Sequence, residues 1–301
     1  MIGTLKTPVK HYLQIYPGRL CCNDTRNQEH RQGEARLDKD QLIEAVLASG
    51  VVLPAPGPGF IRLQAAAANE DAGPRELAAA VSQDPAITGA LLRVANSPVF
   101  RPRSAPRSAQ EAITMLGRTR TLATAASTAL RSQCAGLDAE VIEAVWSASA
   151  HAAAFTYAAC RQSPAKALSD LAYLAALMQD AGIAVLLRRS PELAAALRNQ
   201  GSSMEAGVRA LDALSGSDHA AAGALVARNW KLPQDVAEAI RAHHDPRLAA
   251  RLPDTPRLLA ILLATGRRLR DGVTPDWIDW AELAGTELGF DDERLAELEG
   301  A

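Results

Sequence analysis

Apolar residues recur every three to four positions along most of the chain, which is the spacing that places them on one face of an α-helix. Two long helices are predicted near 138–161 and 165–188. Shorter helices are predicted near 38–49, 75–83, 86–97, 111–117, 118–132, 191–199, 203–214, 218–229, 233–244, 255–270 and 278–299. No segment shows a convincing strand pattern, so we predict an all-α fold, a multi-helix bundle.

The segments between these helices suggest how the chain is organised. Residues 1–37 are polar and show no sustained period, so we expect a loosely ordered extension. Residues 51–60, VVLPAPGPGF, hold three prolines and two glycines and are predicted to be extended rather than helical. Two helical subdomains, 38–135 and 136–301, are expected to meet near Gly136 and to form a cleft between them.

Composition agrees with helices. The 301 residues are 48% hydrophobic but only 4% aromatic, and alanine and leucine, both strong helix formers, supply most of the apolar content. The formal net charge of −2 gives no general attraction to nucleic acid or to an anionic membrane.

Cysteines and apolar runs bear on the cellular setting. The four cysteines, Cys21, Cys22, Cys134 and Cys160, form no CxxC pair, and the last two are expected to be small core residues. The first residues lack the apolar region of a signal peptide, and no uninterrupted apolar run approaches the roughly 20 residues that a bilayer requires. We therefore expect a soluble, cytoplasmic protein in a reducing environment, with no membrane contact.

An ordered series of motifs resembles the HDOD family over about residues 50–270. The series is LPAPGPGF, DPAITGALLRVANSPVF, AITMLG, VWSASA, ALMQDAGIAVLL and SDHAAAGALVARNWKLPQDVAEAIRAHH. One departure is the extra Gly-Pro in LPAPGPG, where the family shows an LP-x-LP pattern. The resemblance implies a bacterial signal-transduction module and a second subdomain like the HD phosphohydrolases.

The same resemblance implies where a metal centre would lie. HD phosphohydrolases use a His, a His-Asp pair and a later Asp to hold one or two divalent metals, which activate a water for attack on phosphorus. The corresponding positions here are Ala148, the pair Gln179-Asp180, and Thr265. Only Asp180 would remain as a ligand, and one carboxylate does not hold a catalytic metal. We expect Asp180 to be a buried polar anchor with hydrogen-bond partners.

Three histidines offer an alternative. His219, His243, His244 and Asp180 could approach one another in such a bundle, although His243-His244 also suit the end of a helix and Asp218 the start of the preceding one. His151 lies near the family's ligand position but is expected to be a packed or surface histidine. No metal or other cofactor is predicted.

Five arginines surround one acid, Glu111, in residues 100–120 and form a candidate contact for phosphates or an acidic partner. They are Arg101, Arg103, Arg107, Arg118 and Arg120. The stretch holds no tryptophan or tyrosine on which bases could stack, so nucleic acid is not expected.

These patterns predict a non-catalytic regulatory module that contacts other signalling proteins through its cleft or its arginine-rich loop. One alternative is a divergent metal-dependent phosphohydrolase that uses Asp180 and the three histidines. Another is a sensor that binds a phosphorylated messenger without cleaving it. No P-loop, dinucleotide fingerprint, GxSxG or HExxH motif is present.

Overall fold

The structure, a computed structural model, describes residues 52–100, 104–198, 204–215 and 217–299. These residues contain helices and no strand, as the apolar period predicts. In chain order the helices are α3 Pro58–Ala67, α4 Pro74–Val81, α5 Pro85–Ala95, α6 Ala109–Ser132, α7 Ala139–Arg161, η2 Lys166–Leu168, α8 Ser169–Met178, α9 Ala181–Arg189, η3 Pro191–Leu193, α10 Ala194–Arg198, α11 Met204–Ser215, α12 His219–Asn229, α13 Gln234–Ala242, α14 Pro246–Ala249, α15 Asp254–Asp271, α16 Pro275–Leu288 and α17 Asp292–Glu299.

Local sequence sets several of these boundaries. The Asp84 carboxylate accepts a hydrogen bond from the Ile87 amide at 3.0 Å and Pro85 follows it, so α5 begins within one residue of the predicted start. Asp138 caps α7 in the same way through the Val141 amide. The two helices predicted around Gly117 adjoin within α6, where this glycine has a φ of 73° that bends the helix.

Three boundary predictions are wrong. The extended segment at 51–60 ends early, because Pro58 occupies the first position of α3, where a proline loses no hydrogen bond. The region 278–299 is two helices, since Gly289 adopts a left-handed φ of 71° that ends α16. The helix predicted at 165–188 consists of η2, α8 and α9, and a turn at Gln179 and Asp180 separates α8 from α9. The side chains of these two turn residues contact polar groups on other helices.

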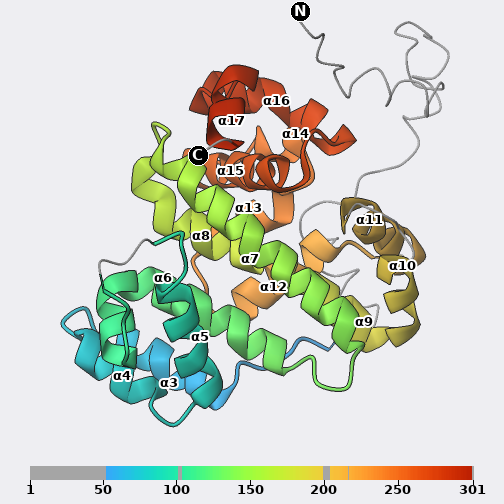
Figure 1. Cartoon of the computed structure of the whole chain (residues 1–301). Helices are drawn as coiled ribbons and strands as arrows, with labels where there is room; N and C mark the ends of the chain where they lie inside the picture. The colour runs from blue at the N-terminus through green and yellow to red at the C-terminus, as the bar shows by residue number, and fades with distance from the viewer. Residues whose placement is uncertain (1–51, 101–103, 199–203, 216, 300–301) are drawn as a thin grey trace, which may run out of the picture. The chain divides into compact units, whose positions relative to one another are not determined.

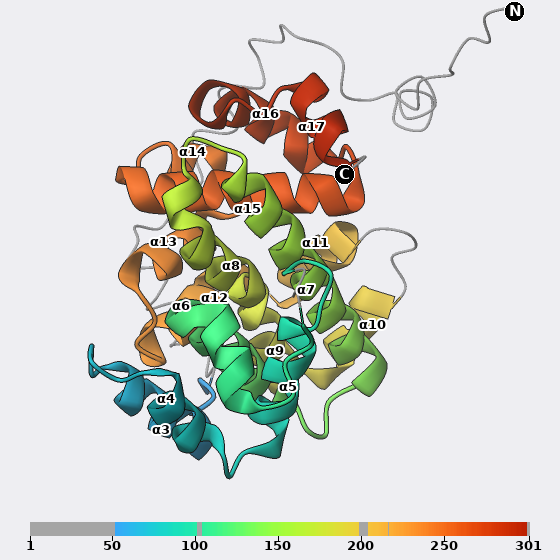
Figure 2. The same ribbon diagram turned by 60° about the vertical axis from the view of Figure 1, so that its left-hand side comes forward.

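Helix α7 packs along α8 and α15, and α9 packs on α12, which in turn packs on α13 (Figure 1). Helices α3, α4 and α5 pack on α6, which joins the rest through α8. At the other end, α16 and α17 pack on α15 (Figure 2). All of the described residues belong to one compact unit, and the division into subdomains near Gly136 stays a prediction. The helix expected at 38–49 and the extension at 1–37 lie outside the described residues.

Most of the core is built from alanine and leucine, as the composition suggests. Its largest fully buried side chains include Trp230, Trp280 and Phe60. A second, smaller cluster joins α9 to the start of α7 and to α10 and α11. Cys134 and Cys160 are both buried as free thiols, as expected of core residues.

One apolar stretch bears on the prediction that no segment spans a membrane. Within the part of the chain that the structure describes, Lys166–Arg189 is long and apolar enough to cross a membrane by length and composition alone. Its apolar window is 83% buried by other helices, and an enclosed core helix passes the same test. The polar pair Gln179-Asp180 interrupts this run, so it is not an uninterrupted apolar segment.

Candidate functional site

The positions that correspond to the ligands of HD phosphohydrolases offer few ligand atoms. Ala148 carries none. The Thr265 hydroxyl, on α15, is fully buried and donates to the Ile261 carbonyl at 2.9 Å. The buried Asp180 carboxylate accepts a hydrogen bond from Ser149 on α7 at 3.1 Å, which is a partner of the kind that a buried carboxylate needs.

At Gln179, which stands where the HD pair has its histidine, the side chain contacts the guanidinium group of Arg267. The buried Arg267 side chain donates to the Gln179 amide oxygen at 3.3 Å and to the backbone carbonyl of His243. It also forms an ion pair of 3.1 Å with Asp276 on α16. The Gln179 side-chain nitrogen is buried and has no hydrogen-bond partner. With the Gln179 oxygen bound to a cation, these residues do not fit the metal centre of the HD phosphohydrolases.

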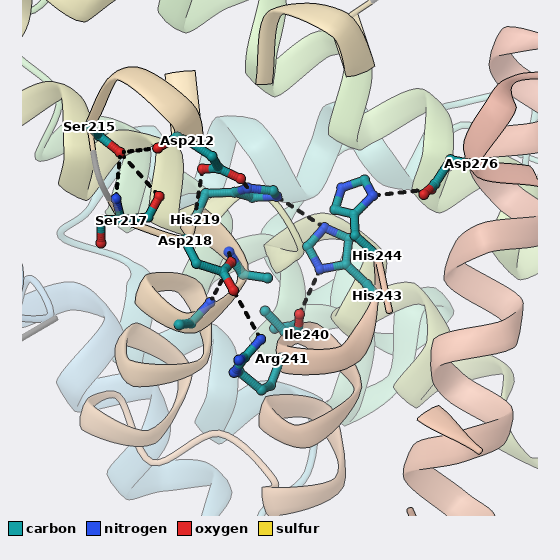
Figure 3. A network of polar contacts seen from close by, with 12 residues as sticks. Asp212, Ser215, Ser217, Asp218, His219, Ile240, Arg241, His243, His244 and Asp276 are labelled. Carbon is teal, nitrogen blue, oxygen red and sulfur yellow. Dashed lines mark hydrogen bonds and ion pairs between the residues drawn. The ribbon is translucent and has the colours of Figure 1, made fainter. Parts of the chain in front are cut away.

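Three histidines meet beside this position, where the first residue of α12 faces the end of α13 (Figure 3). We call His219, His243 and His244 the histidine cluster. One ring nitrogen from each lies within 4.8 Å of those of the other two. The Nε2 atoms of His219 and His243 are 3.3 Å apart. His219 and His243 are buried, whereas the His244 side chain is 23% exposed and gives the cluster its contact with solvent.

Each ring of the histidine cluster is held through its Nδ1 atom. His219 Nδ1 is 2.6 Å from an Asp212 carboxylate oxygen, and His243 Nδ1 is 2.6 Å from the Ile240 carbonyl. His244 Nδ1 is 3.1 Å from Asp276 (Figure 3). These contacts fix the ring orientations and leave the Nε2 atoms turned toward the middle of the cluster.

The surroundings give the three rings different acidities. Burial lowers the pKa of His219, but its hydrogen bond to Asp212 and the negative charges of Asp212 and Asp180 outweigh burial and raise this pKa above 6.5. Burial and nearby positive charges, that of Arg267 among them, hold the pKa values of His243 and His244 well below 6.5. At neutral pH the last two rings are therefore neutral.

Of the four residues proposed from the sequence as a polar cluster, the three histidines are in contact and Asp180 is hydrogen-bonded elsewhere. The three histidines meet, and Asp180 acts on His219 through its charge while its hydrogen bond goes to Ser149. His151 is exposed on α7.

The arginine-rich stretch is divided between exposed and engaged side chains. Arg101 and Arg103 lie outside the described residues, and Arg107 is exposed. Arg118 donates to four backbone carbonyls at the end of α3 and in the turn after it, those of Ala67, Asn69, Glu70 and Ala72. Arg120 lies over the rings of Phe100 and Tyr157 and forms an ion pair with Asp170. The last two arginines therefore stabilise the fold.

Sequence reasoning missed three important residues. Asp212 and Asp276 lie on helices far along the chain from the histidines that they orient, so no short motif links them. Arg267 carried a detectable signal: in LLATGRRLRD, a charge follows directly on an apolar helix face. A buried charge of this kind requires partners.

Comparison with solved structures shows an HD-like helical fold. An HDOD domain protein with unknown function from Geobacter sulfurreducens matches with a TM-score of 0.63 and 20% identity, over 87% of this chain and 95% of that one. A candidate metal-dependent phosphohydrolase from Shewanella amazonensis SB2B matches with a TM-score of 0.61 and 21% identity, over 85% and 93%. A candidate signal transduction protein from Marinobacter aquaeolei VT8 matches with a TM-score of 0.58 and 22% identity, over 91% and 62%.

Among curated proteins, one from Treponema pallidum (strain Nichols) is 26% identical over 223 residues. The match covers 72% of this chain but only 42% of the length of that relative. The HDOD domain family itself matches residues 53–246, which is more than half of the chain. The whole motif series noted in the sequence lies within that range, and the protein belongs to the HDOD family.

Proposed function

We propose that this protein is a non-catalytic signalling module that acts in the cytoplasm through contacts with other signalling proteins. The observation that carries the proposal is the position of Arg267. Its guanidinium binds the Gln179 oxygen at the place of the HD pair, where a hydrolase would hold a metal ion. A fixed positive charge at that point opposes a divalent cation and leaves no metal-bound water to attack phosphorus.

The alternative function is a metal-dependent phosphohydrolase, and the histidine cluster and Asp180 are the residues that would support it. Asp180 offers a carboxylate to that rival but is held by Ser149, and the position of the pair's histidine is taken by Gln179. Relatives in the comparison carry both descriptions, since one is a candidate signal transduction protein and another a candidate metal-dependent phosphohydrolase.

Hydrolysis of bis(p-nitrophenyl) phosphate and of cyclic dinucleotides tests this proposal, with Mn²⁺, Zn²⁺ or Mg²⁺ added to the wild-type protein and to Asp180→Asn. We expect no turnover above that of the metal alone. Turnover that requires Asp180 would overturn the proposal in favour of a phosphohydrolase.

A binding assay separates the module from a messenger sensor. Metal-free protein is heated with and without nucleotides, and we expect an unchanged Tm. A ligand present at 100 times its Kd would stabilise the folded state by about 2.7 kcal/mol, so a raised Tm would favour the sensor.

A further inference from the structure

We propose that the exposed side of α16 is a docking surface for residues 1–20, the basic and partly apolar segment at the start of the same chain. Helix α16 buries Trp277 and Trp280 and packs on α15 and α14. We call its solvent-facing residues, with the one that precedes the helix, the α16 face. They are Val273, Pro275, Ile278, Asp279, Glu282 and Thr286.

The α16 face exposes apolar and acidic side chains together. Only five large apolar side chains are exposed among the described residues, and two of them, Ile278 at 67% and Val273 at 57%, belong to this face. Ile278 lies one helical turn before Glu282, so the two side chains are neighbours on the surface of α16. Within the described part of the chain, neither Asp279 nor Glu282 has an ion pair. The α16 face therefore has apolar area and negative charge without a partner.

The charge of this end of the chain favours a positive occupant. Residues 271–299 contain ten acidic residues and one basic residue, Arg294, which gives a net charge of −9 in a chain whose total is −2. Some of these acids are neutralised within the fold, as Asp276 is by Arg267. Asp279 and Glu282 are not. A surface of this kind attracts a basic segment and repels an acidic one.

Residues 1–20, MIGTLKTPVKHYLQIYPGRL, have the complementary character, although the extension to which they belong is polar overall. They contain no acid. Their basic residues are Lys6, Lys10 and Arg19. A segment with three positive charges and several large apolar residues matches both properties of the α16 face.

The order of residues within 7–18 is typical of a short amphipathic helix. Thr7-Pro8 is a helix-start signal and Pro17-Gly18 a stop signal. The apolar residues between them recur at the spacing of one helix face and are Val9, Tyr12, Leu13 and Tyr16. An apolar stripe of this length with so few charges binds lipid weakly, so a protein surface suits it better than a membrane.

The length of chain outside the described residues does not limit the contact. Residues 21–51 join the segment to Val52, and thirty-one residues reach about 100 Å when extended. A domain of about 250 residues has a diameter of roughly 45 Å. Tethering raises the local concentration of the segment to about the millimolar range, so weak apolar and charge contacts suffice.

Docking of residues 1–20 would cover the α16 face. A basic, apolar segment of another protein would then have to displace them before it could bind there. The inference does not rest on the proposed function, because neither hydrolysis nor its absence bears on whether the segment is held.

Chymotrypsin cleavage of the full chain at low protein concentration tests the contact. Cleavage after Tyr12 is followed by mass spectrometry and should be slow in the wild type. Ile278→Ser and Asp279→Lys/Glu282→Lys should each speed it about tenfold, because they remove the apolar and the charged parts of the surface. The control Glu70→Lys/Asp71→Lys makes the same charge change at an exposed turn and should leave the rate unchanged.

A charge exchange separates this contact from a change of fold. Lys6→Glu/Lys10→Glu should speed the cut in the wild-type background. Combined with Asp279→Lys/Glu282→Lys, the same substitutions should slow it again, because opposite charges then face each other once more. The substituted side chains of α16 are exposed, and circular dichroism checks that the helices remain.

Three results would overturn the inference. One is a wild-type protein that is cut as fast as Asp279→Lys/Glu282→Lys. Another is protection that disappears on dilution, which would assign the segment to the surface of a second copy. The third is a segment protected only by phosphatidylglycerol vesicles, which would assign it to an anionic membrane.

Discussion

The Gln179-Asp180 turn and the histidine cluster lie side by side and differ in what their polar groups bind. At the turn, the side-chain oxygens of Gln179 and Asp180 are engaged by Arg267 and Ser149. In the histidine cluster, the outward nitrogens are engaged and the inward ones face each other. The number of ligand-type residues therefore says less about a metal site than the direction in which their lone pairs point.

Arg267 is the residue that joins the two regions, since it binds Gln179 in one and the His243 carbonyl in the other. Its presence has opposite consequences for them. It fills the position of the HD pair with a positive charge, and it helps to keep His243 and His244 neutral by lowering their pKa values. A neutral imidazole is the form that binds metal.

The largest effect should come from Arg267→Met, which keeps much of the apolar stem and removes the charge. The Gln179 oxygen, the His243 carbonyl and Asp276 lose a donor in a buried setting, so we expect the free energy of unfolding to fall by about 3 kcal/mol. Urea denaturation measures the change. The exposed Arg75→Met is the control, expected within about 0.5 kcal/mol of wild type. Equal stabilities of the two variants would show that Arg267 does not hold the two regions together.

A close helix contact should give the next effect. A Cβ atom added at Gly182 of α9 would lie 1.9 Å from the His219 carbonyl oxygen, so Gly182→Ala must push α9 away from α12. We expect a loss of about 2–3 kcal/mol in the free energy of unfolding. Gly285→Ala on α16 meets no atom within 4 Å and should instead stabilise by about 0.5–1 kcal/mol, because alanine favours helix. A Gly182→Ala protein as stable as Gly285→Ala would contradict the close packing of the two regions.

A smaller effect, confined to the turn, is expected for Ser149→Ala. The Asp180 carboxylate loses its hydrogen bond, at a cost of about 1–2 kcal/mol. Ser132→Ala, at an exposed position, is the control, since both hydroxyls lie within hydrogen-bond distance of the carbonyl four residues earlier and only that of Ser149 also reaches a carboxylate. Thermal unfolding of the two variants measures the difference. Equal Tm values would mean that Asp180 has another anchor.

Much of the fold could be predicted because helix signals are local. Asp84-Pro85 and the apolar period of α7 act over a few residues, and the structure agrees with both. The division between α8 and α9 could not be predicted in this way, since the residues at the turn contact Ser149 and Arg267 on helices that are distant in the chain.

The site was predictable in its residue types but not in its geometry. The sequence named His219, His243 and His244, and the structure brings them together. It could not show that Asp212 and Asp276 orient them, because these carboxylates approach only when α11 and α16 are in place. The sequence also could not show that the Arg118 side chain donates to backbone carbonyls of its own chain rather than to a partner. Those carbonyls lie about fifty residues earlier in the sequence.

The smallest expected effect is on the reactivity of the two buried thiols, Cys134 and Cys160. They lie near opposite ends of α7, one in each of the two hydrophobic clusters. Cys160 belongs to the main core, and Cys134 shares the smaller one with α9, the helix that begins after Asp180. Burial raises the pKa of both thiols from 9.0 to about 11. At pH 8 the reactive thiolate is then about one thousandth of each, rather than about one tenth. Mass mapping after iodoacetamide should show both unlabelled until urea unfolds the protein.

The same shift gives a pH dependence with a definite sign. Because folding raises these pKa values, the folded protein holds the two protons more tightly than the unfolded chain does. The stability that results is fully present below pH 9.0 and is lost as the pH rises toward about 11. Urea midpoints should therefore fall across that interval, and less so in Cys134→Ala/Cys160→Ala. If Cys134 alone is labelled at pH 8, the core beside the Gln179-Asp180 turn opens more readily than the main core, and the two regions differ in local stability as well as in their polar contacts.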